Sequence, residues 1–373
     1  MMKKVKGQLN NQNVYEKYLI IIIFAALFLR IIIASATKGV PQDIACFKSW
    51  ASAAASNGLF NFYTIDMFKD YPPVFIYILY IIGKLQALLS LSYDHWFFTL
   101  MIKTPAIIAD LVTAYLIYRL CKKHLQPRTS LILAATYAFN PAVFFNSSTY
   151  GQVDSILALL IVTALYLISE HRISLAAIPY SVAVLLKPQG IIFLPVLFFV
   201  LVSDFISKKS IKNFLLSFVY AAASYIIIVL PFKSNNGPLW LLKLINSTTG
   251  QYDYASVNAF NLFALTGGNW KKDSEPWIIL NHQTWGMIFI VLITAYVMFL
   301  FFKSKHTALP YVASLILIAG VFVLAHRMHE RYMFPALALA PLAYMHLKNR
   351  RFLYLYGGFN FTIFLNIWSY YYI

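Results

Sequence analysis

Apolar runs of about 20 residues recur along the whole chain, and they constrain its fold more than any other feature. A helix needs about 20 predominantly apolar residues to cross roughly 30 Å of hydrocarbon. Only 12% of the residues are charged, which is far below the usual share in a soluble domain. The sequence therefore predicts an all-α, polytopic helical membrane protein with about eleven transmembrane helices, within a range of about 10 to 13. The predicted spans lie near residues 18–36, 99–120, 129–147, 152–170, 172–187, 188–206, 212–232, 284–303, 306–325, 333–348 and 352–371.

The net charge of +17 comes largely from short loops between these runs. In membrane proteins, short loops rich in lysine and arginine usually face the cytoplasm. The basic residues of this chain form no patch or stripe that would favour binding to nucleic acid. The predicted cytoplasmic residues are Lys3, Lys4, Lys6, Lys17, Arg119, Lys122, Lys123, Arg128, Arg172, Lys208, Lys209, Lys212, Lys303, Lys305, Lys348, Arg350 and Arg351. The N-terminus is therefore predicted in the cytoplasm, and the first apolar run is interpreted as an uncleaved anchor.

This orientation requires a single crossing between Asp43 on the outside and Lys122 on the inside. Residues 73–91 must then lie along the outer leaflet or dip into it. Residues 37–98 thus form a first outer loop, and residues 233–283 form a second long one, within a single catalytic domain (1–373). The stretch "DIACFKSWASAAAS" has Ile44, Phe47, Trp50 and Ala51 at helical spacing, which predicts an interfacial helix. Cys46 and Cys121 are placed at opposite faces and cannot pair.

Ionisable residues gather at the outer ends of five separate segments. Charges at membrane depth are costly and are usually paired or functional. The residues are Asp43, Asp70, Asp154, Lys187, His326, Arg327, His329, Glu330 and Arg331. Taken singly, Asp154 could cap a helix, Lys187 could extend to the headgroups, and Asp70 could begin a turn. The histidines could equally be loop surface residues. Their convergence at one membrane level favours a functional site.

The segment "HRMHERY" (326–332) is the densest of these clusters. If it continues the preceding helix, His326 and Glu330 lie four residues apart on one face, as do Arg327 and Arg331. The guanidinium groups of arginine and the imidazoles of histidine can donate hydrogen bonds to phosphate oxygens, so the cluster predicts a site for a lipid phosphate. Asp43 opens the interfacial helix, where its carboxylate can accept a proton from an alcohol as a phosphate leaving group departs.

Seven motifs in this chain resemble those of one enzyme family. They are "QDIACFKSWA" (42–51), "DYPPVFIYIL" (70–79), "KTPAIIADL" (103–111), "YGQVDSI" (150–156), "LLKPQGIIFLP" (185–195), "SVNAFNLFAL" (256–265) and "HRMHERYMFP" (326–335). Together they resemble the GT-C superfamily of glycosyltransferases, and most closely the bacterial relatives of the mannosyltransferase that adds the second mannose in GPI-anchor synthesis.

The resemblance implies the GT-C fold and an enzyme that uses a polyprenyl- or dolichyl-phosphate sugar on the outer side of a membrane. It implies that Asp43 is the base and that the donor phosphate meets Lys187, His329, Arg331, Arg327 and His326. Residues expected to hold sugar or acceptor are Asp70, Tyr71, Gln152, Asp154, Asn258, Asn261 and Glu330. No cofactor is expected, although a divalent metal is not excluded.

The predicted reaction moves a hexose, with mannose favoured, to an acceptor hydroxyl with inversion. The acceptor is a glycan, glycolipid or protein, and the predicted location is a prokaryotic plasma membrane. A transporter of lipid-linked sugars is the first alternative, but its polar site would lie near the midplane between internal repeats, and no repeat is evident. A metal-dependent hydrolase is the second, but the order "HRMHE" differs from the metal-binding H-E-x-x-H pattern.

Overall fold

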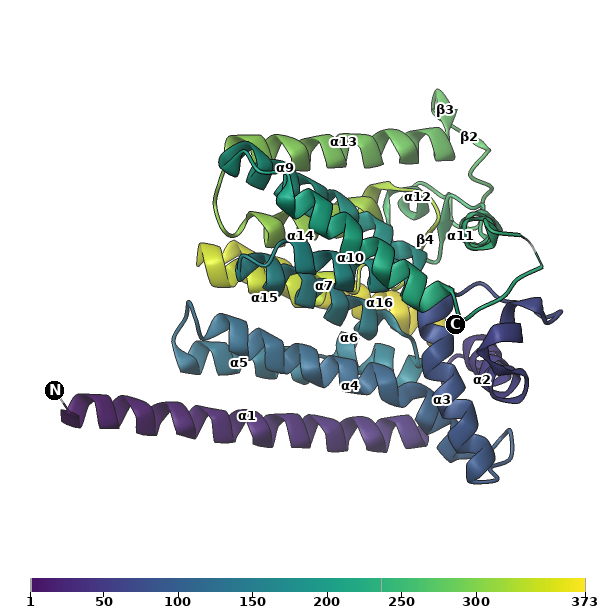
Figure 1. Cartoon of the computed structure of the whole chain (residues 1–373), viewed down its shortest axis with the longest axis horizontal. Helices are drawn as coiled ribbons and strands as arrows, with labels where there is room; N and C mark the ends of the chain where they lie inside the picture. The colour runs from purple at the N-terminus through teal and green to yellow at the C-terminus, as the bar shows by residue number, and fades with distance from the viewer. Residues whose placement is uncertain (1, 236, 373) are drawn as a thin grey trace.

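The protein is a bundle of helices whose long axes run in roughly one direction (Figure 1). The computed structural model describes residues 2–235 and 237–372, without the side chains of residues 2–13 and 249. The side chains of Lys3, Lys4 and Lys6, which are predicted to be cytoplasmic, lie outside this description, and so does residue 236 of the second predicted loop.

Each predicted span coincides with a helix of the bundle. The bundle helices are α1 (Met2–Ala36), α4 (Trp96–Cys121), α5 (Pro127–Ala138), α7 (Asp154–Ser169), α8 (Ala177–Leu186), α9 (Leu194–Lys208), α10 (Lys212–Val229), α13 (His282–Lys303), α14 (Leu309–Leu324), α15 (Ala336–Leu347) and α16 (Arg351–Tyr372). Within the described residues, 5 helices are long and apolar enough to cross a membrane: Val14–Ala36, Trp96–Cys121, Pro188–Lys208, Lys212–Val229 and His282–Lys303. The all-α membrane fold class is confirmed, whereas the number of spans stays a prediction.

The core lies around α4 and α15. Helix α15 packs against α4, α14 and α16, and its residues Ala336 to Ala343 are all buried. In α1, α10 and α13, only 22%, 17% and 17% of an apolar 18-residue stretch is buried within the protein, compared with 67% in α4. A helix that is apolar all round and yet little buried in protein suits contact with lipid.

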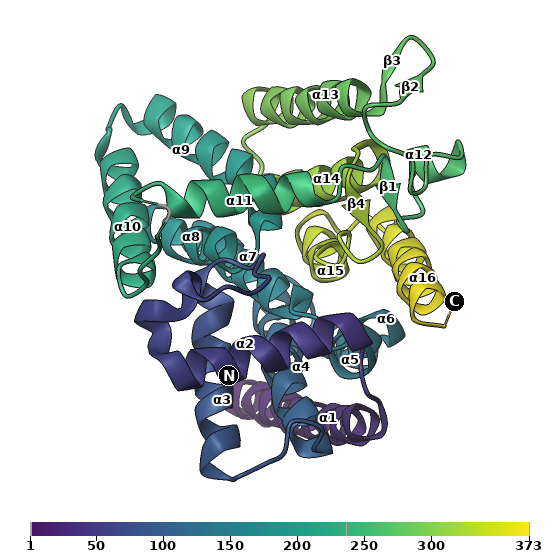
Figure 2. The ribbon, with the colours of Figure 1, turned by 90° about the vertical axis from the view of Figure 1, so that its right-hand side faces the viewer.

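Three helices lie across one end of the bundle. These are α2 (Pro41–Asn61), α3 (Pro73–Leu88) and α11 (Trp240–Gln251), and Figures 1 and 2 show that α3 crosses the direction of α1 and α4. Ile44, Phe47, Trp50 and Ala51 of α2 are buried together, as their helical spacing predicts. We call this end of the molecule the α2 end and the opposite end the far end.

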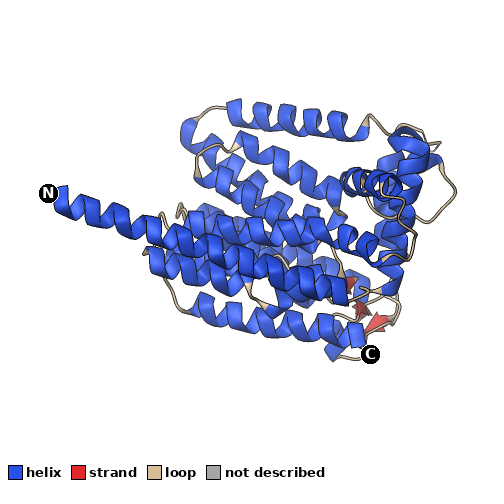
Figure 3. Ribbon diagram, turned by 90° about the horizontal axis from the view of Figure 1, so that it is seen from below, coloured by secondary structure: helices blue, strands red, loops and turns tan. Residues whose placement is uncertain are grey.

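The described strands are short and lie at the α2 end (Figure 3). Strand β1 (Ser256–Val257) pairs in parallel with β4 (Met328–His329), and β2 (Pro276–Trp277) pairs antiparallel with β3 (Leu280–Asn281). In the chain, helix α12 (Leu262–Leu265) lies between β1 and β2.

The expected helical continuation of α14 through residues 326–331 is wrong. Helix α14 ends at Leu324, and Arg327 adopts a φ of 58°, which no right-handed helix contains. The backbone N–H of Arg327 donates to the carbonyl of Tyr254 at 3.0 Å, and the next two residues form β4. Pairing with a distant loop therefore takes the hydrogen bonds that a helix would have used.

Proline residues interrupt two other stretches. The predicted span 129–147 is broken at Asn140, whose side chain caps α6 (Pro141–Phe144), and the chain continues as the π-helical turn η2 (Phe145–Tyr150). Lys187 is extended, with φ of −153°, before Pro188, which begins the 3₁₀ turn η4 (Pro188–Phe193). Two further 3₁₀ turns are η1 (Phe62–Thr64) and η3 (Ser174–Ala176). Cys46 and Cys121 are both free, as predicted.

Candidate active site

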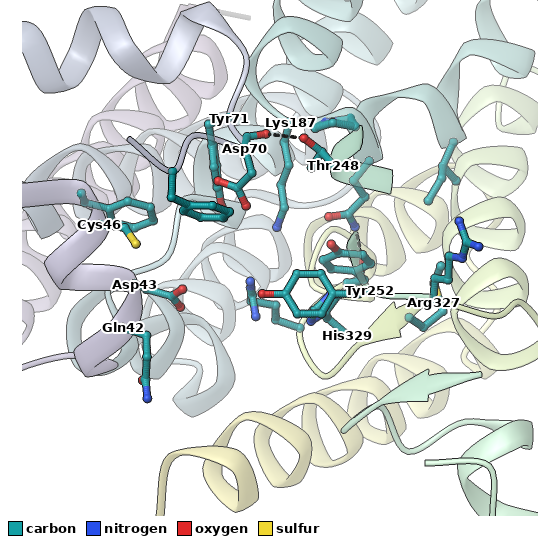
Figure 4. A pocket seen from close by; sticks show the side chains of 18 of the residues that line it. Gln42, Asp43, Cys46, Asp70, Tyr71, Lys187, Thr248, Tyr252, Arg327 and His329 are labelled. Carbon is teal, nitrogen blue, oxygen red and sulfur yellow. Dashed lines mark hydrogen bonds between the residues drawn. The ribbon is translucent and has the colours of Figure 1, made fainter. Parts of the chain in front are cut away.

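A cavity of about 490 Å³ opens at the α2 end, and most of the predicted site residues meet there. Helix α2 forms one wall, and the segment 326–332 together with α11 forms the opposite wall (Figure 4). The predicted residues that line it are Asp43, Asp70, Tyr71, Lys187, His326, Arg327, His329 and Arg331. The carboxylate of Asp43 and the ammonium of Lys187 both point into this space.

A buried network of charges forms the floor of the cavity: Lys187 and Arg331 line the cavity, and their carboxylate partners are buried beneath them. Lys187 Nζ lies 2.5 Å from Asp154 Oδ1, and both side chains are almost fully buried, at 6% and 0% exposure. Arg331 donates to Glu330 at 2.5 Å and lies 3.7 Å from the second oxygen of Asp154. Tyr150 donates its hydroxyl hydrogen to Glu330 at 2.5 Å. Asp154 therefore does not cap a helix, and Lys187 does not extend to the headgroups.

The network fixes two cations without using all their donors. Arg331 Nε is buried and has no hydrogen-bond partner among the described residues. The side chain is 12% exposed and lines the cavity. This nitrogen faces Oδ2 of Asp154, itself without a hydrogen-bond partner in the described part of the chain, at 3.7 Å. That contact orients the guanidinium, and the exposed part of the side chain is left for an incoming anionic oxygen.

Asp43 is held by a buried amide next to the cavity. Gln152 donates to Asp43 Oδ2, and Tyr71 donates to Gln152 Oε1 at 3.4 Å. Burial raises the pKa of the Asp43 carboxyl, although the nearby charge of Arg331 acts in the opposite direction. A carboxylate with a raised pKa is a better proton acceptor than an exposed one.

Asp70 faces the same cavity from the segment before α3. Thr248 of α11 donates to its backbone carbonyl at 3.0 Å, and its side-chain Oδ1 is buried without a described partner. Burial raises the pKa of Asp70 to about 6, and the charge of Asp43 adds to this effect. Asp70 can therefore take up a proton near neutral pH.

The stability of the protein is expected to fall as pH rises through the pKa of Asp70. The folded state holds this proton up to about pH 6, whereas an aspartate of ordinary pKa, as in the unfolded chain, releases it at 3.8. Stability is therefore greatest below the lower value and is lost as pH rises through the higher one. Thermal unfolding in detergent between these pH values measures the slope. Asp70→Asn should flatten it, and the exposed control Asp66→Asn should not; an unchanged slope in Asp70→Asn would contradict this prediction.

His329 is enclosed by two tyrosines. Its ring centroid lies 4.8 Å from that of Tyr252 and 4.9 Å from that of Tyr332. Burial holds the pKa of His329 well below its usual value, and the charges of Arg331 and Lys187 act in the same direction. The imidazole is therefore neutral and can donate a single hydrogen bond to a ligand.

His326 and Arg327 turn toward another partner. Arg327 Nε donates to Asp273 at 2.6 Å, and His326 Nε2 lies 3.7 Å from the same oxygen. Figure 4 shows the guanidinium of Arg327 at the edge of the cavity, away from Lys187. Burial lowers the pKa of His326 to about 4. These two residues tie the loop that contains Asp273 to the cavity wall.

Asn258 and Asn261, which are predicted to hold sugar or acceptor, lie outside this cavity. Asn258 Oδ1 accepts from the indole of Trp270 at 2.8 Å, and Asn261 caps α12 by accepting from Ala264 N at 3.0 Å. They line a separate hollow beside α12 and the end of α14.

Several residues that line the cavity were not among the predicted site residues. They are Gln42, Cys46, Phe47, Trp50, Phe68, Pro188, Gln189, Ile192, Thr248, Tyr252, Met287, Met328 and Tyr332. Gln189 and Tyr332 lie inside the quoted motifs, so the motifs could have found them. Thr248 and Tyr252 belong to α11 or directly follow it and carry no local signal.

Curated proteins with similar sequences are GPI mannosyltransferases, in agreement with the expected resemblance. GPI mannosyltransferase 1 of Kluyveromyces lactis and that of Saccharomyces cerevisiae are each 32% identical over 99 residues, covering 26% of this chain and 24% of the relative. GPI mannosyltransferase 1 of Dictyostelium discoideum is 27% identical over 106 residues, covering 28% and 24%. The matches span about a quarter of the length of these relatives.

Among solved structures, the oligosaccharyltransferase of Archaeoglobus fulgidus is similar. The apo form matches with a TM-score of 0.44 and 13% identity, over 92% of this chain and 54% of that chain. The same enzyme tethered to an acceptor peptide matches with a TM-score of 0.44 and 15% identity, over 94% and 49%.

A family match covers the middle of the chain. Residues 68–326 match the family model described as Glycosyltransferase family 87. The matched range contains Asp70, Asp154 and Lys187, begins after Asp43 and ends before Arg331. Because this range is more than half of the 373 residues, the chain belongs to glycosyltransferase family 87, and the prediction of a glycosyltransferase is confirmed.

Proposed function

We propose that this chain transfers a hexose, with mannose favoured, from a polyprenyl monophosphate to an acceptor hydroxyl on the extracytoplasmic side of a membrane. Asp43 acts as the base, and the anomeric configuration inverts. The observation that carries the proposal is that Asp43, from the α2 wall, lines the same cavity as Lys187 and Arg331 of its floor. A sugar between them would have a base on one side and phosphate ligands on the other.

The phosphate end of the donor suits the two fixed cations of the floor. Lys187 and Arg331 are held in place by buried carboxylates, so neither side chain must be ordered when the donor binds. The side chain of Arg331 and the neutral imidazole of His329, two residues earlier in the sequence, both line the cavity. As the phosphate leaves, its growing negative charge is stabilised by these fixed donors.

The chemical step is a single displacement at the anomeric carbon. The acceptor oxygen forms a bond to this carbon while the carbon–oxygen bond to the phosphate breaks, and the phosphate leaves with the electron pair. The acceptor proton passes to Asp43, whose second oxygen is engaged by Gln152. Attack from the side opposite the phosphate inverts the configuration. Asp70 and Tyr71 line the cavity and are placed to contact hydroxyls of the sugar or acceptor, whereas Gln152 is buried behind Tyr71 and Asp43 and orients both.

The distribution of charge supports an outward-facing site. Loops at the far end contain Lys122, Lys123, Lys208, Lys209 and Lys303, whereas the α2 end carries acidic residues of both long loops. Basic loops favour the cytoplasm, and this supports an extracytoplasmic location for the α2 end. A prokaryotic plasma membrane fits this assignment, and the acceptor is a glycan, glycolipid or protein.

The donor can be identified by incubating the purified full chain with a panel of polyprenyl-phosphate sugars and a simple glycoside acceptor. We expect polyprenyl-phosphate mannose to be consumed, with release of polyprenyl phosphate and formation of a product of inverted configuration. Consumption of nucleotide sugars alone would contradict the proposed donor class.

Transfer is expected to proceed without a divalent metal. Lys187 and Arg331 supply positive charge to the leaving phosphate, which is the task that a metal performs in other transferases. The rate in excess EDTA should equal the rate in added Mg²⁺ or Mn²⁺. Loss of activity with chelator and recovery with metal would contradict this expectation.

A further inference from the structure

A second polar cavity lies at the far end of the bundle, and the proposed transfer reaction does not use it. Its volume is about 520 Å³, and it is enclosed by the far ends of α4, α7, α9 and α15 and by the loop between α13 and α14. The basic and imidazole side chains in its lining are Lys123, His124, His171, Lys305, His306 and His346.

The carboxylates in this lining are already neutralised. Glu170 pairs with Lys123, and Asp204 pairs with Lys208 at 2.7 Å and accepts from Asn213 at 2.6 Å. Lys305 has no ion-pair partner among the described residues. The cavity therefore has a surplus of positive charge at the level of Lys305.

The imidazoles add hydrogen-bond donors. The rings of His124 and His346 lie 4.6 Å apart, and Nε2 of His346 is buried without a described partner. Among the described residues, no three His, Cys, Asp or Glu side chains are close enough together to hold a metal ion. The arrangement suits an anion with several oxygen acceptors, such as a phosphate.

An apolar groove leads away from this cavity along α9 and α13. It is lined by Phe199, Val202, Ile206 and Phe302, and it shares Ser203, Ser207, Phe301 and Lys305 with the cavity. A ligand that joins a phosphate to a hydrocarbon chain could occupy both at once. A free phosphate would use only the polar part.

We infer that the far-end cavity binds the phosphate head group of an anionic lipid, with Lys305 as its main charged contact and the groove between α9 and α13 holding the chain. The inference is independent of the proposed transfer reaction, since the two cavities share no lining residue. On the proposed orientation, this is a lipid site of the cytoplasmic leaflet.

Lipid binding can be measured by isothermal titration of the purified full chain in an uncharged detergent. The probes are dioctanoyl phosphatidic acid, dioctanoyl phosphatidylcholine and inorganic phosphate. We expect phosphatidic acid to bind more tightly than either of the others. Lys305→Gln should weaken its binding about tenfold, because one charge-assisted contact is lost.

A matched control lies on the same helix end. Lys303 rests over the ring of Phe299 at 5.6 Å and does not line the cavity, so Lys303→Gln should leave phosphatidic acid binding unchanged. Lys305 is exposed, and unfolding temperatures of both variants should match that of the natural protein. Equal binding by Lys305→Gln would overturn the inference. Equal affinity for inorganic phosphate would overturn the assignment to a lipid.

Discussion

Replacing Asp43 by asparagine is expected to lower the rate of sugar transfer by about a hundredfold or more, which is the range for loss of a general base. Donor affinity should remain nearly unchanged. Asparagine preserves the shape of the side chain, and its carbonyl can still accept from the amide of Gln152. It cannot take the acceptor proton. Single-turnover transfer and donor titration measure the two quantities separately.

The matched control for this substitution is Asp66→Asn in the same loop. Asp66 is exposed and does not line the cavity, so its loss should change neither rate nor affinity. If Asp43→Asn transfers sugar at the natural rate, Asp43 is not the base. If it loses donor binding instead, Asp43 holds the donor and another group accepts the proton.

Removal of the Arg331 guanidinium is expected to weaken donor binding by roughly ten- to a hundredfold. A charge-assisted hydrogen bond to phosphate contributes about 1.5 to 3 kcal/mol, and the substitution removes at least one. The single variant Arg331→Gln also leaves Glu330 buried without its cation, which costs about 3 to 5 kcal/mol in comparable buried pairs. Loss of binding in that variant could therefore reflect unfolding.

The double variant Arg331→Gln with Glu330→Gln separates the two effects. It removes one positive and one negative charge from a pair joined at 2.5 Å, so the buried charge stays balanced. The unfolding temperature of the double variant should be closer to that of the natural protein than the unfolding temperature of the single variant is. Its donor affinity should stay low. Natural donor affinity in a folded double variant would remove Arg331 from the phosphate site.

The helical fold could be predicted from local patterns. The apolar runs are long, and a lipid-facing helix such as α1 can be predicted from its own residues without knowledge of its neighbours in the fold. The buried face of α2 was also predictable, because Ile44, Phe47 and Trp50 repeat at helical spacing. These features depend on residues within one or two turns of each other.

The geometry of the site depends on distant residues and could be predicted only in part. From the sequence alone, Lys187 could extend to the lipid headgroups. The structure shows that it pairs instead with Asp154, 33 residues earlier in the chain. The sequence around Arg327 suggests a continuing helix, because no nearby residue indicates that the backbone N–H of Arg327 donates to the carbonyl of Tyr254. Thr248 enters the cavity only because α11 crosses the α2 end.

The central claim is that a lipid-borne sugar lies between Asp43 and the buried cations. The most direct measurement is a cryo-electron microscopy structure of Asp43→Asn with bound polyprenyl-phosphate mannose. Our account predicts that the phosphate contacts Arg331 and Lys187 and that the anomeric carbon faces residue 43. A phosphate bound outside this cavity, or a sugar separated from residue 43 by packed side chains, would contradict it.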